Sequence, residues 1–123
     1  MPQNILAVDD EIHMLKLLER IILEKTPYDI LTTNNALEIP SILEENTFDL
    51  LIVDLKMPGM DGLDILRLIR EQQRPEEVVI ITAFGTLESA LDAFTQGVFG
   101  YITKPFTIQE LTGVITPLLT EAD

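Results

Sequence analysis

The sequence contains no cysteine, which excludes disulfide bonds and thiolate metal sites. Its longest apolar runs are far shorter than the roughly 20 residues that a membrane-spanning helix needs. The first ten residues, Met1–Asp10, include two acids and no lysine or arginine, which is unlike a secretory signal. We therefore expect a soluble cytoplasmic protein, and the absence of cysteine is compatible with that reducing compartment.

Basic residues are also few: 8 lysines and arginines stand against 21 acids, for a net charge of −13. A domain that binds nucleic acid through its own surface needs a basic face. Here only Arg67, Arg70 and Arg74 cluster, and acidic residues flank them. We therefore expect no direct binding of DNA or RNA. The acidic surface fits a cation site or a basic partner, although solubility alone would also explain it.

The chain has 123 residues, 46% of them hydrophobic, which is enough for the core of one domain spanning residues 1–123. Short apolar runs alternate along it with patterns of helical period. Continuous apolar runs rich in β-branched residues are typical of strands buried on both faces of a sheet. Such runs predict five strands, the second weaker than the others: Asn4–Val8, Tyr28–Thr33, Leu50–Val53, Val78–Ile81 and Phe99–Ile102.

Helical patterns follow each of these strands. Asp61 and Thr86 are suited to cap the third and fourth helices, while Pro40 predicts a late start or a kink in the second. Five βα repeats joined by right-handed crossovers predict a doubly wound α/β fold, in which helices cover both faces of a five-stranded parallel sheet. The predicted helices are Glu11–Lys25, a poorer one after Asn35, Gly62–Gln73, Leu87–Gln96 and one that Thr107 and Glu110 begin with capping-box spacing.

Polar residues stand where the predicted strands end. Asp9 and Asp10 follow the first strand, Asp54 the third, Thr82 the fourth, and Lys104 lies just beyond the fifth. In open parallel sheets, ligands bind beyond the carboxyl ends of the strands. These three carboxylates, one hydroxyl and one ammonium are therefore expected to meet at one edge of the sheet.

Such a group of side chains indicates phosphoryl chemistry. Closely packed carboxylates suit Mg²⁺, which prefers a few hard oxygen ligands, retained waters and a phosphate oxygen. A carboxylate can also attack phosphorus and form an aspartyl phosphate. Because a transferring phosphoryl group is stabilised mainly by charge, a metal ion and a lysine are the parts that the reaction needs. The hydroxyl of Thr82 could donate a hydrogen bond to a phosphoryl oxygen.

Taken singly, each of these residues has a simpler interpretation. Asp10 could cap the first helix, Asp54 could be a turn residue, and Lys104 could be a solvated lysine. Their combination at strand ends is what favours a site. The single histidine, His13, has no partner pattern and is expected to be exposed. The remaining acids are expected on solvated faces or loops, among them Glu19, Glu24, Glu44, Glu45, Glu76 and Glu77.

The sequence resembles the response regulator receiver family over nearly its whole length. Four motifs carry the resemblance: Val8-Asp9-Asp10-Glu11, Asp54-Leu55-Lys56-Met57-Pro58-Gly59-Met60-Asp61-Gly62, Ile81-Thr82-Ala83 and Tyr101-Ile102-Thr103-Lys104-Pro105-Phe106. The resemblance implies a flavodoxin-like three-layer sandwich. It also implies a phosphorylation switch that signals to transcription regulation through an output domain not present in this chain.

The resemblance further implies a role for each motif residue. Asp54 is implied to be the phospho-acceptor, with Lys104 contacting the phosphoryl group beside a cis peptide bond to Pro105. For Mg²⁺, it implies Asp10 as a direct ligand and Asp9 as a ligand acting mainly through water, with Asp54 and the main-chain carbonyl of Lys56 as further ligands. Thr82 and Tyr101 are implied to be the switch pair. The implied partner is a sensor histidine kinase or histidine phosphotransfer protein, with a homodimer possible on activation.

The first predicted helix has more apolar positions than one core-facing stripe needs. Ile12, Leu15, Leu18 and Ile22 form the expected inward stripe. A second stripe consists of Met14, Leu17 and Ile21. An exposed apolar stripe beside a site is typical of a docking surface, so we expect the kinase partner to bind there. The alternative is that the last helix covers this second stripe, around Leu111 and Leu118.

Two other functions compete with a phosphorylation switch. A haloacid dehalogenase-type phosphatase also uses an aspartate nucleophile with Mg²⁺, threonine and lysine. That family needs a second acid two residues after the nucleophile, where this chain has Lys56, and the chain also lacks residues for a substrate cap. The other rival is a degenerate receiver that only binds proteins, against which the intact acids, Thr82 and Lys104 argue.

Overall fold

The computed structural model describes residues 4–83 and 85–121, with side chains through Leu118. Within these ranges, strands and helices alternate along the chain, as the sequence predicts. The strands are β1 (Asn4–Val8), β2 (Asp29–Thr33), β3 (Leu50–Val53), β4 (Glu77–Thr82) and β5 (Gly100–Thr103). The helices are α1 (Ile12–Lys25), a 3₁₀ turn η1 (Ala36–Glu38), α2 (Ile39–Glu45), α3 (Gly62–Glu71), α4 (Leu87–Thr95) and α5 (Ile108–Glu121).

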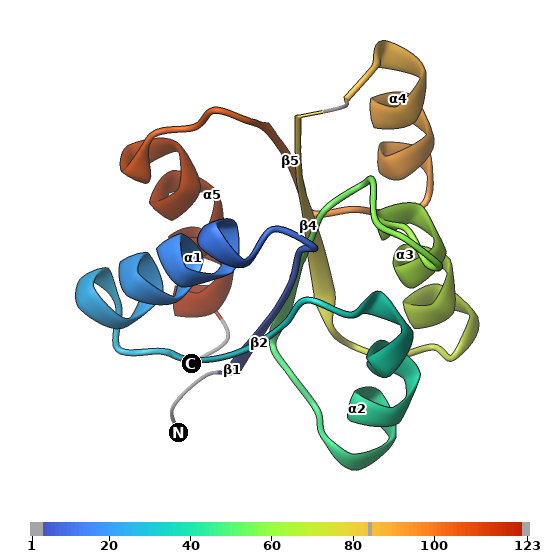
Figure 1. Cartoon of the computed structure of the whole chain (residues 1–123), viewed down its shortest axis with the longest axis horizontal. Coiled ribbons are helices and arrows are strands. Elements are labelled where there is room, and N and C mark those ends of the chain that lie inside the picture. Colours follow the sequence, from blue (N-terminus) through green and yellow to red (C-terminus); the bar gives the residue numbers. More distant parts are fainter. Residues whose placement is uncertain (1–3, 84, 122–123) are drawn as a thin grey trace.

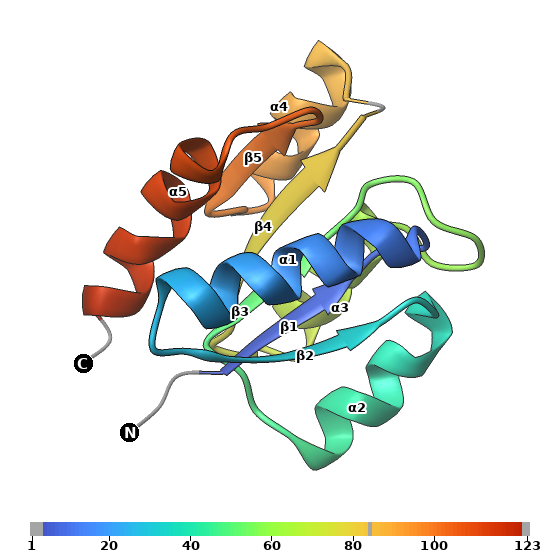
Figure 2. The ribbon, with the colours of Figure 1, turned by 60° about the vertical axis from the view of Figure 1, so that its left-hand side comes forward.

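All neighbouring strands of the sheet are parallel, in the order β2-β1-β3-β4-β5. Figure 1 shows α1 and α5 on one face of this sheet and α2, α3 and α4 on the other. The strand arrows in Figure 2 point toward the same end of the molecule. The predicted doubly wound (βα)5 sandwich is therefore confirmed.

Alternate residues of each strand enter two separate cores. Ile5 and Ala7 of β1 pack with α1 and α5, whereas Leu6 and Val8 pack with α2 and α3. In β3, Ile52 faces the first core and Val53 the second. Because both faces of the sheet are covered, the strands are apolar without interruption, which is why these runs were readable in the sequence.

The helix starts follow the predicted capping residues. Asp61 accepts a hydrogen bond from the main-chain nitrogen of Asp64 at 2.9 Å, and the Asp64 carboxylate accepts one from the nitrogen of Asp61. Thr86 makes the same kind of reciprocal box with Ser89. Pro40 lies in the first turn of α2 after η1, which agrees with the predicted late start because that turn needs no proline N–H.

Two predictions about α1 were wrong. Ile21, expected on an exposed stripe, is only 4% exposed and belongs to the same buried cluster as Leu111 and Leu118 of α5. Ile12, expected in the core, is 52% exposed. Ile21 is buried because α1 packs against α5 as well as against the sheet. Ile12 is exposed because it lies in the first turn of α1, where it lines a hollow instead of entering the core. The alternative in which the last helix covers the second stripe therefore holds for Ile21.

Glu76 was also wrongly expected in solvent, since its side chain is completely buried before β4. Its carboxylate accepts hydrogen bonds from the guanidinium of Arg74 at 2.7 and 3.0 Å and from the main-chain nitrogen of Phe48 at 3.1 Å. A carboxylate can be buried when charge-assisted hydrogen bonds of this kind replace its hydration. The hydrogen bond from Phe48 joins the loop before β3 to the loop before β4.

Candidate functional site

Main-chain hydrogen bonds extend the sheet one residue past the ends of three strands. The nitrogen of Asp9 donates to the carbonyl of Thr33 at 3.3 Å, and that of Asp54 donates to the carbonyl of Val8 at 3.1 Å. Likewise, the nitrogen of Lys104 donates to the carbonyl of Thr82 at 2.9 Å. These bonds hold Asp9, Asp54 and Lys104 at one edge of the sheet, as the strand ends predict.

The ammonium of Lys104 is the centre of this edge. Its Nζ lies 2.8 Å from Oδ2 of Asp54, 2.9 Å from Oδ2 of Asp9 and 3.3 Å from Oε1 of Glu11. The Lys104 side chain is 9% exposed, so water screens these charges little. Burial lowers the pKa of Lys104, but the hydrogen bonds that its ammonium donates to Asp54 and Asp9 outweigh this effect, and the net pKa is raised. Lys104 is therefore a fixed positive charge.

Burial has the opposite consequence for Asp9. The Asp9 side chain is 3% exposed, and this burial raises the pKa of Asp9. The negative charge of Asp54 adds to the rise, while a hydrogen bond from the main-chain nitrogen of Glu11 and the proximity of Lys104 oppose it. A group of buried carboxylates around one ammonium carries excess negative charge, which favours a further cation.

Asp54 is held in place from two sides. Oδ1 accepts a hydrogen bond from the main-chain nitrogen of Lys56 at 3.1 Å, while Oδ2 faces Lys104. Behind Asp54, the start of α3 approaches so closely that a Cβ at Gly62 would lie 2.6 Å from the Asp54 carbonyl oxygen. Glycine at position 62 therefore lets α3 begin directly against the strand end that presents Asp54.

The structure brings together a set of carboxylates that differs from the predicted metal ligands. Among the described residues, Asp9, Glu11 and Asp54 each offer an oxygen within 4.8 Å of the others. Asp10, predicted to be a direct ligand, is exposed and lies outside this group. Glu11 enters the group through Oε1, which lies 3.3 Å from the ammonium of Lys104. Hard carboxylate oxygens at this spacing fit Mg²⁺.

The two predicted switch residues lie on neighbouring strands. Thr82 is fully buried at the end of β4, and Tyr101 is half-buried on β5, paired in the sheet with Ile80. The Tyr101 hydroxyl lies 3.0 Å from Oγ of Ser89 in α4. A Cβ at Gly85 would lie 2.5 Å from that hydroxyl, so glycine leaves room for this position of the ring.

Comparison with known proteins decides the family. Residues 5–116 match the response regulator receiver domain. The chain belongs to this family. It is 37% identical over 109 residues to the DNA-binding transcriptional regulator NtrC of Escherichia coli strain K12. The match covers 89% of this chain but only 23% of that relative.

Solved receiver structures have the same fold. A response regulator receiver domain protein from Clostridium thermocellum is 34% identical, with a TM-score of 0.87 over 98% of this chain and 96% of that one. A CheY-like receiver domain protein from Methanospirillum hungatei JF-1 is 26% identical, with a TM-score of 0.89 over 98% of this chain and 96% of that one. The predicted family is therefore confirmed. The receiver is a signalling domain.

The proposed docking stripe of this receiver is only partly exposed. Leu17 is 43% exposed, Met14 is half-buried against the core, and Ile21 is buried.

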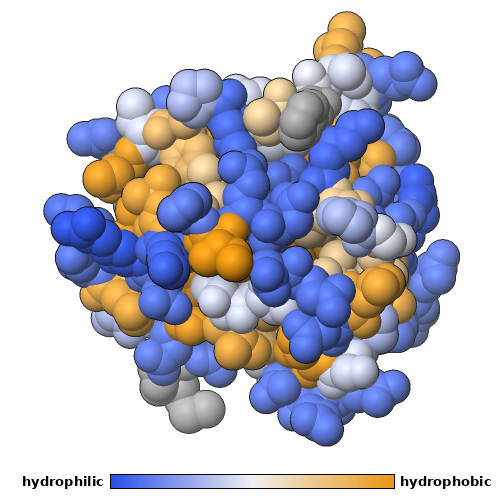
Figure 3. All heavy atoms as spheres, viewed as in Figure 1, coloured by the Kyte–Doolittle hydropathy of each residue, from blue (hydrophilic) through white to orange (hydrophobic). Residues whose placement is uncertain are grey.

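No helix in the described part of the receiver is long and apolar enough to cross a membrane. Figure 3 shows hydrophilic residues over most of one face, with apolar residues interspersed in small groups.

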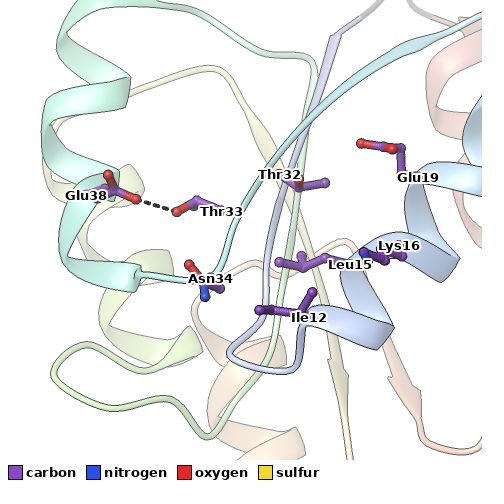
Figure 4. A pocket seen from close by; sticks show the side chains of 8 residues that line it. All are labelled: Ile12, Leu15, Lys16, Glu19, Thr32, Thr33, Asn34 and Glu38. Atoms are coloured by element: carbon purple, nitrogen blue, oxygen red, sulfur yellow. Dashed lines mark hydrogen bonds between the residues drawn. The ribbon is translucent and has the colours of Figure 1, made fainter.

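A hollow of about 470 Å³ lies between α1, the end of β2 and η1. Figure 4 shows its lining, including Ile12 and Lys16 of α1 and the hydrogen bond from the Thr33 hydroxyl to Glu38, which measures 2.6 Å. The Thr33 hydroxyl already donates its hydrogen bond to the Glu38 carboxylate, so this pair gives no reason to assign a ligand to the hollow. The acidic edge around Lys104 therefore remains the candidate site of the receiver.

Proposed function

We propose that Asp54 accepts a phosphoryl group from a phosphohistidine. The observation that carries this proposal is the burial of Asp54 at the end of β3, with Oδ2 at 2.8 Å from the ammonium of Lys104. An oxygen of Asp54 forms the new bond to phosphorus as the phosphorus–nitrogen bond of the donor breaks, and the imidazole nitrogen keeps the electron pair. Lys104 balances the charge of the bound phosphoryl group.

We further propose that the reaction depends on Mg²⁺. The carboxylates of Asp9 and Asp54, with Asp10 and the main-chain carbonyl of Lys56, would hold the ion, which when bound neutralises phosphoryl oxygens. Support comes from the carboxylates of Asp9 and Asp54, which lie close together at this edge, and from their excess of negative charge over Lys104. Thr82, at the end of the neighbouring strand, would donate its hydroxyl to a phosphoryl oxygen.

The partner classes follow from this chemistry and from the relatives. The donor would be a sensor histidine kinase or a histidine phosphotransfer protein. Because this chain spans 23% of the length of NtrC, a DNA-binding transcriptional regulator, we propose that the receiver controls transcription through an output domain, directly or as a homodimer. The switch pair, Thr82 and Tyr101, would carry the signal to the output face.

Incubation with acetyl phosphate and Mg²⁺, followed by intact mass spectrometry, tests the proposal. We expect the mass of one phosphoryl group to be gained, and the gain to be absent in EDTA. A phosphatase would release phosphate with many turnovers, and a degenerate receiver would show neither result. The phosphatase is disfavoured by Lys56, which occupies the position where that family needs an acid.

Replacing Asp10 by alanine is expected to weaken Mg²⁺ binding. The expected loss is at least several-fold, because a carboxylate ligand contributes a full charge, whereas bound water contributes none. Isothermal titration with MgCl₂ measures it. Asp29→Ala is the matched control, since it removes the same charge at the amino end of β2. Equal Mg²⁺ affinity in Asp10→Ala and Asp29→Ala would show that Asp10 is not a ligand.

A phosphoryl mimic is expected to move the Tyr101 ring inward and Thr82 toward the site, as a two-state population shift. The protein has two tyrosines and no tryptophan, so in a Tyr28→Phe background the ring signals of Tyr101 can be followed alone by NMR. Beryllofluoride should shift these signals. Gly85→Ala should also shift them without the mimic, because its Cβ would clash with the Tyr101 hydroxyl. Unchanged signals on adding beryllofluoride would refute the switch role.

Leu17→Ala is expected to slow phosphotransfer from the cognate kinase while leaving labelling by acetyl phosphate unchanged. The reason is that a small donor needs no docking surface, whereas a protein donor loses apolar contact area. Leu23→Ala is the control, because Leu23 is 55% exposed on the same helix, nearer its far end. An equal loss with both donors would mean that Leu17 supports the fold instead.

A further inference from the structure

Glu11 differs from the other two carboxylates that contact Lys104. Asp9 and Asp54 are buried and belong to the machinery proposed above, whereas the Glu11 side chain is 62% exposed. Its Oε1 nevertheless lies 3.3 Å from Nζ of Lys104. Glu11 is therefore a negative charge at the mouth of the site, between solvent and the ammonium.

The main chain around Glu11 is fixed. Its nitrogen donates to Oδ1 of Asp9 at 2.9 Å, and its carbonyl accepts from the nitrogens of Met14 and Leu15 as α1 begins. Glu11 occupies the N-cap position of α1, yet its side chain makes no capping hydrogen bond. Serine, threonine, aspartate or asparagine would be the capping choice there. The carboxylate is therefore free of a helix-capping role and reaches Lys104 instead.

This position has a consequence for any phosphodonor. Because Nζ of Lys104 lies 2.8 Å from Oδ2 of Asp54 and 3.3 Å from Oε1 of Glu11, a phosphoryl group that bonds to Asp54 comes near the negative charge of Glu11. Like charges at such distances repel, and the repulsion grows with the charge of the incoming donor. Because Glu11 is exposed, dissolved salt screens this repulsion. Salt screens the interactions of Lys104 with the buried carboxylates of Asp9 and Asp54 much less.

We propose that Glu11 selects among phosphodonors by charge. It disfavours small, highly anionic donors, which must diffuse to the site unaided, relative to a phosphohistidine that a docked protein delivers. This inference rests on the proposed phosphoryl transfer to Asp54. It assigns to Glu11 a donor-selecting role, distinct from that of a metal ligand.

Two small phosphodonors of different net charge distinguish a charge effect of Glu11 from an effect on the transfer reaction itself. Near neutral pH, acetyl phosphate is mainly a dianion, whereas phosphoramidate is mainly a zwitterion with one net negative charge. We expect Glu11→Gln to raise kcat/KM about tenfold for acetyl phosphate and about threefold for phosphoramidate, at a Mg²⁺ concentration that saturates each variant. The difference between the two donors should shrink as ionic strength rises. Glu11→Asp, which keeps the charge, should retain most of the wild-type donor preference.

Glu19→Gln is the matched control, because Glu19 is exposed on α1, about two turns after Glu11, and this variant makes the same change in net charge. It should leave the ratio of the two donors unchanged. The NMR signal of the Lys104 ammonium gives a readout independent of activity, and Glu11→Gln should shift it while Glu19→Gln should not. Calorimetric titration with MgCl₂ gives the Mg²⁺ affinity of each variant.

The outcomes separate this inference from the proposed function. If wild-type protein takes no phosphoryl group from either donor, both the proposed function and the role of Glu11 fail. If wild-type protein is labelled but Glu11→Gln changes both donors by the same factor at every salt concentration, only the donor-selecting role is overturned. Such an equal change together with weakened Mg²⁺ binding would make Glu11 a metal ligand.

Discussion

Asp54→Asn should abolish phosphoryl uptake and leave the fold intact. The asparagine amide is not a nucleophile toward phosphorus, so no acyl phosphate can form. The replacement has the same shape, and its side-chain oxygen can still accept the hydrogen bond from the nitrogen of Lys56. Lys104 keeps Asp9 and Glu11 as counter-ions. Intact mass after incubation with acetyl phosphate and Mg²⁺ measures the loss, and circular dichroism checks the fold.

Asp49→Asn is the matched control for this experiment. Asp49 directly precedes the same strand, β3, and its carboxylate accepts a hydrogen bond from the nitrogen of Asn4, at the end of the sheet away from Lys104. This variant should be labelled like the wild type. Undiminished labelling of Asp54→Asn by either small donor would show that another residue is the acceptor.

Much of the fold was predictable because both faces of the sheet are covered. Each strand is then a continuous apolar run, and a polar residue marks the place where the strand leaves the core. The same logic located Asp9, Asp54 and Lys104, which the structure places side by side. Their positions follow from the ends of strands, and a strand end depends on local sequence.

Glu11, Ile21 and Glu76 were not predictable in this way. Whether Glu11 reaches Lys104 depends on a contact across 93 positions of the chain. Ile21 is buried because of how α1 packs against α5, which helical period alone does not determine. Glu76 can be buried because the guanidinium of Arg74, in the loop after α3, pairs with its carboxylate. A glutamate shortly before the start of a predicted strand carries no sign of burial, although the arginine two residues earlier was a usable signal.

The Arg74–Glu76 pair should contribute strongly to stability. Arg74 also donates to the carbonyls of Leu43 and Asn46 at 2.9 and 3.0 Å, and Glu76 also accepts from Phe48. The pair therefore links the end of α2, the loop before β3 and the loop before β4. Removing one partner of a buried ion pair leaves the other without its counter-ion, at a cost of about 3–5 kcal/mol.

Glu76→Gln should accordingly lower the free energy of unfolding by about 3 kcal/mol at pH 7. The lower end of that range applies because the Arg74 side chain is 16% exposed and keeps two carbonyl acceptors. Urea denaturation followed by circular dichroism measures the loss. Glu77→Gln is the control, since Glu77 is the next residue and is only half-buried. It should change stability by about 0.5 kcal/mol or less.

The pH dependence gives the same prediction a second, independent test. Burial raises the pKa of Glu76, but the hydrogen bonds from Arg74 and from the nitrogen of Phe48 outweigh it, so the net pKa lies below the ordinary value of 4.5. A carboxylate with a lowered folded-state pKa stabilises the protein above its unfolded pKa, and that stability is lost as the pH falls through the folded value. The stability gap between wild type and Glu76→Gln should therefore be constant above about pH 5.5 and narrow below pH 4.5. A gap of the same size at pH 3.5, or a Glu77→Gln variant as unstable as Glu76→Gln, would show that the ion pair is not the source of the stability.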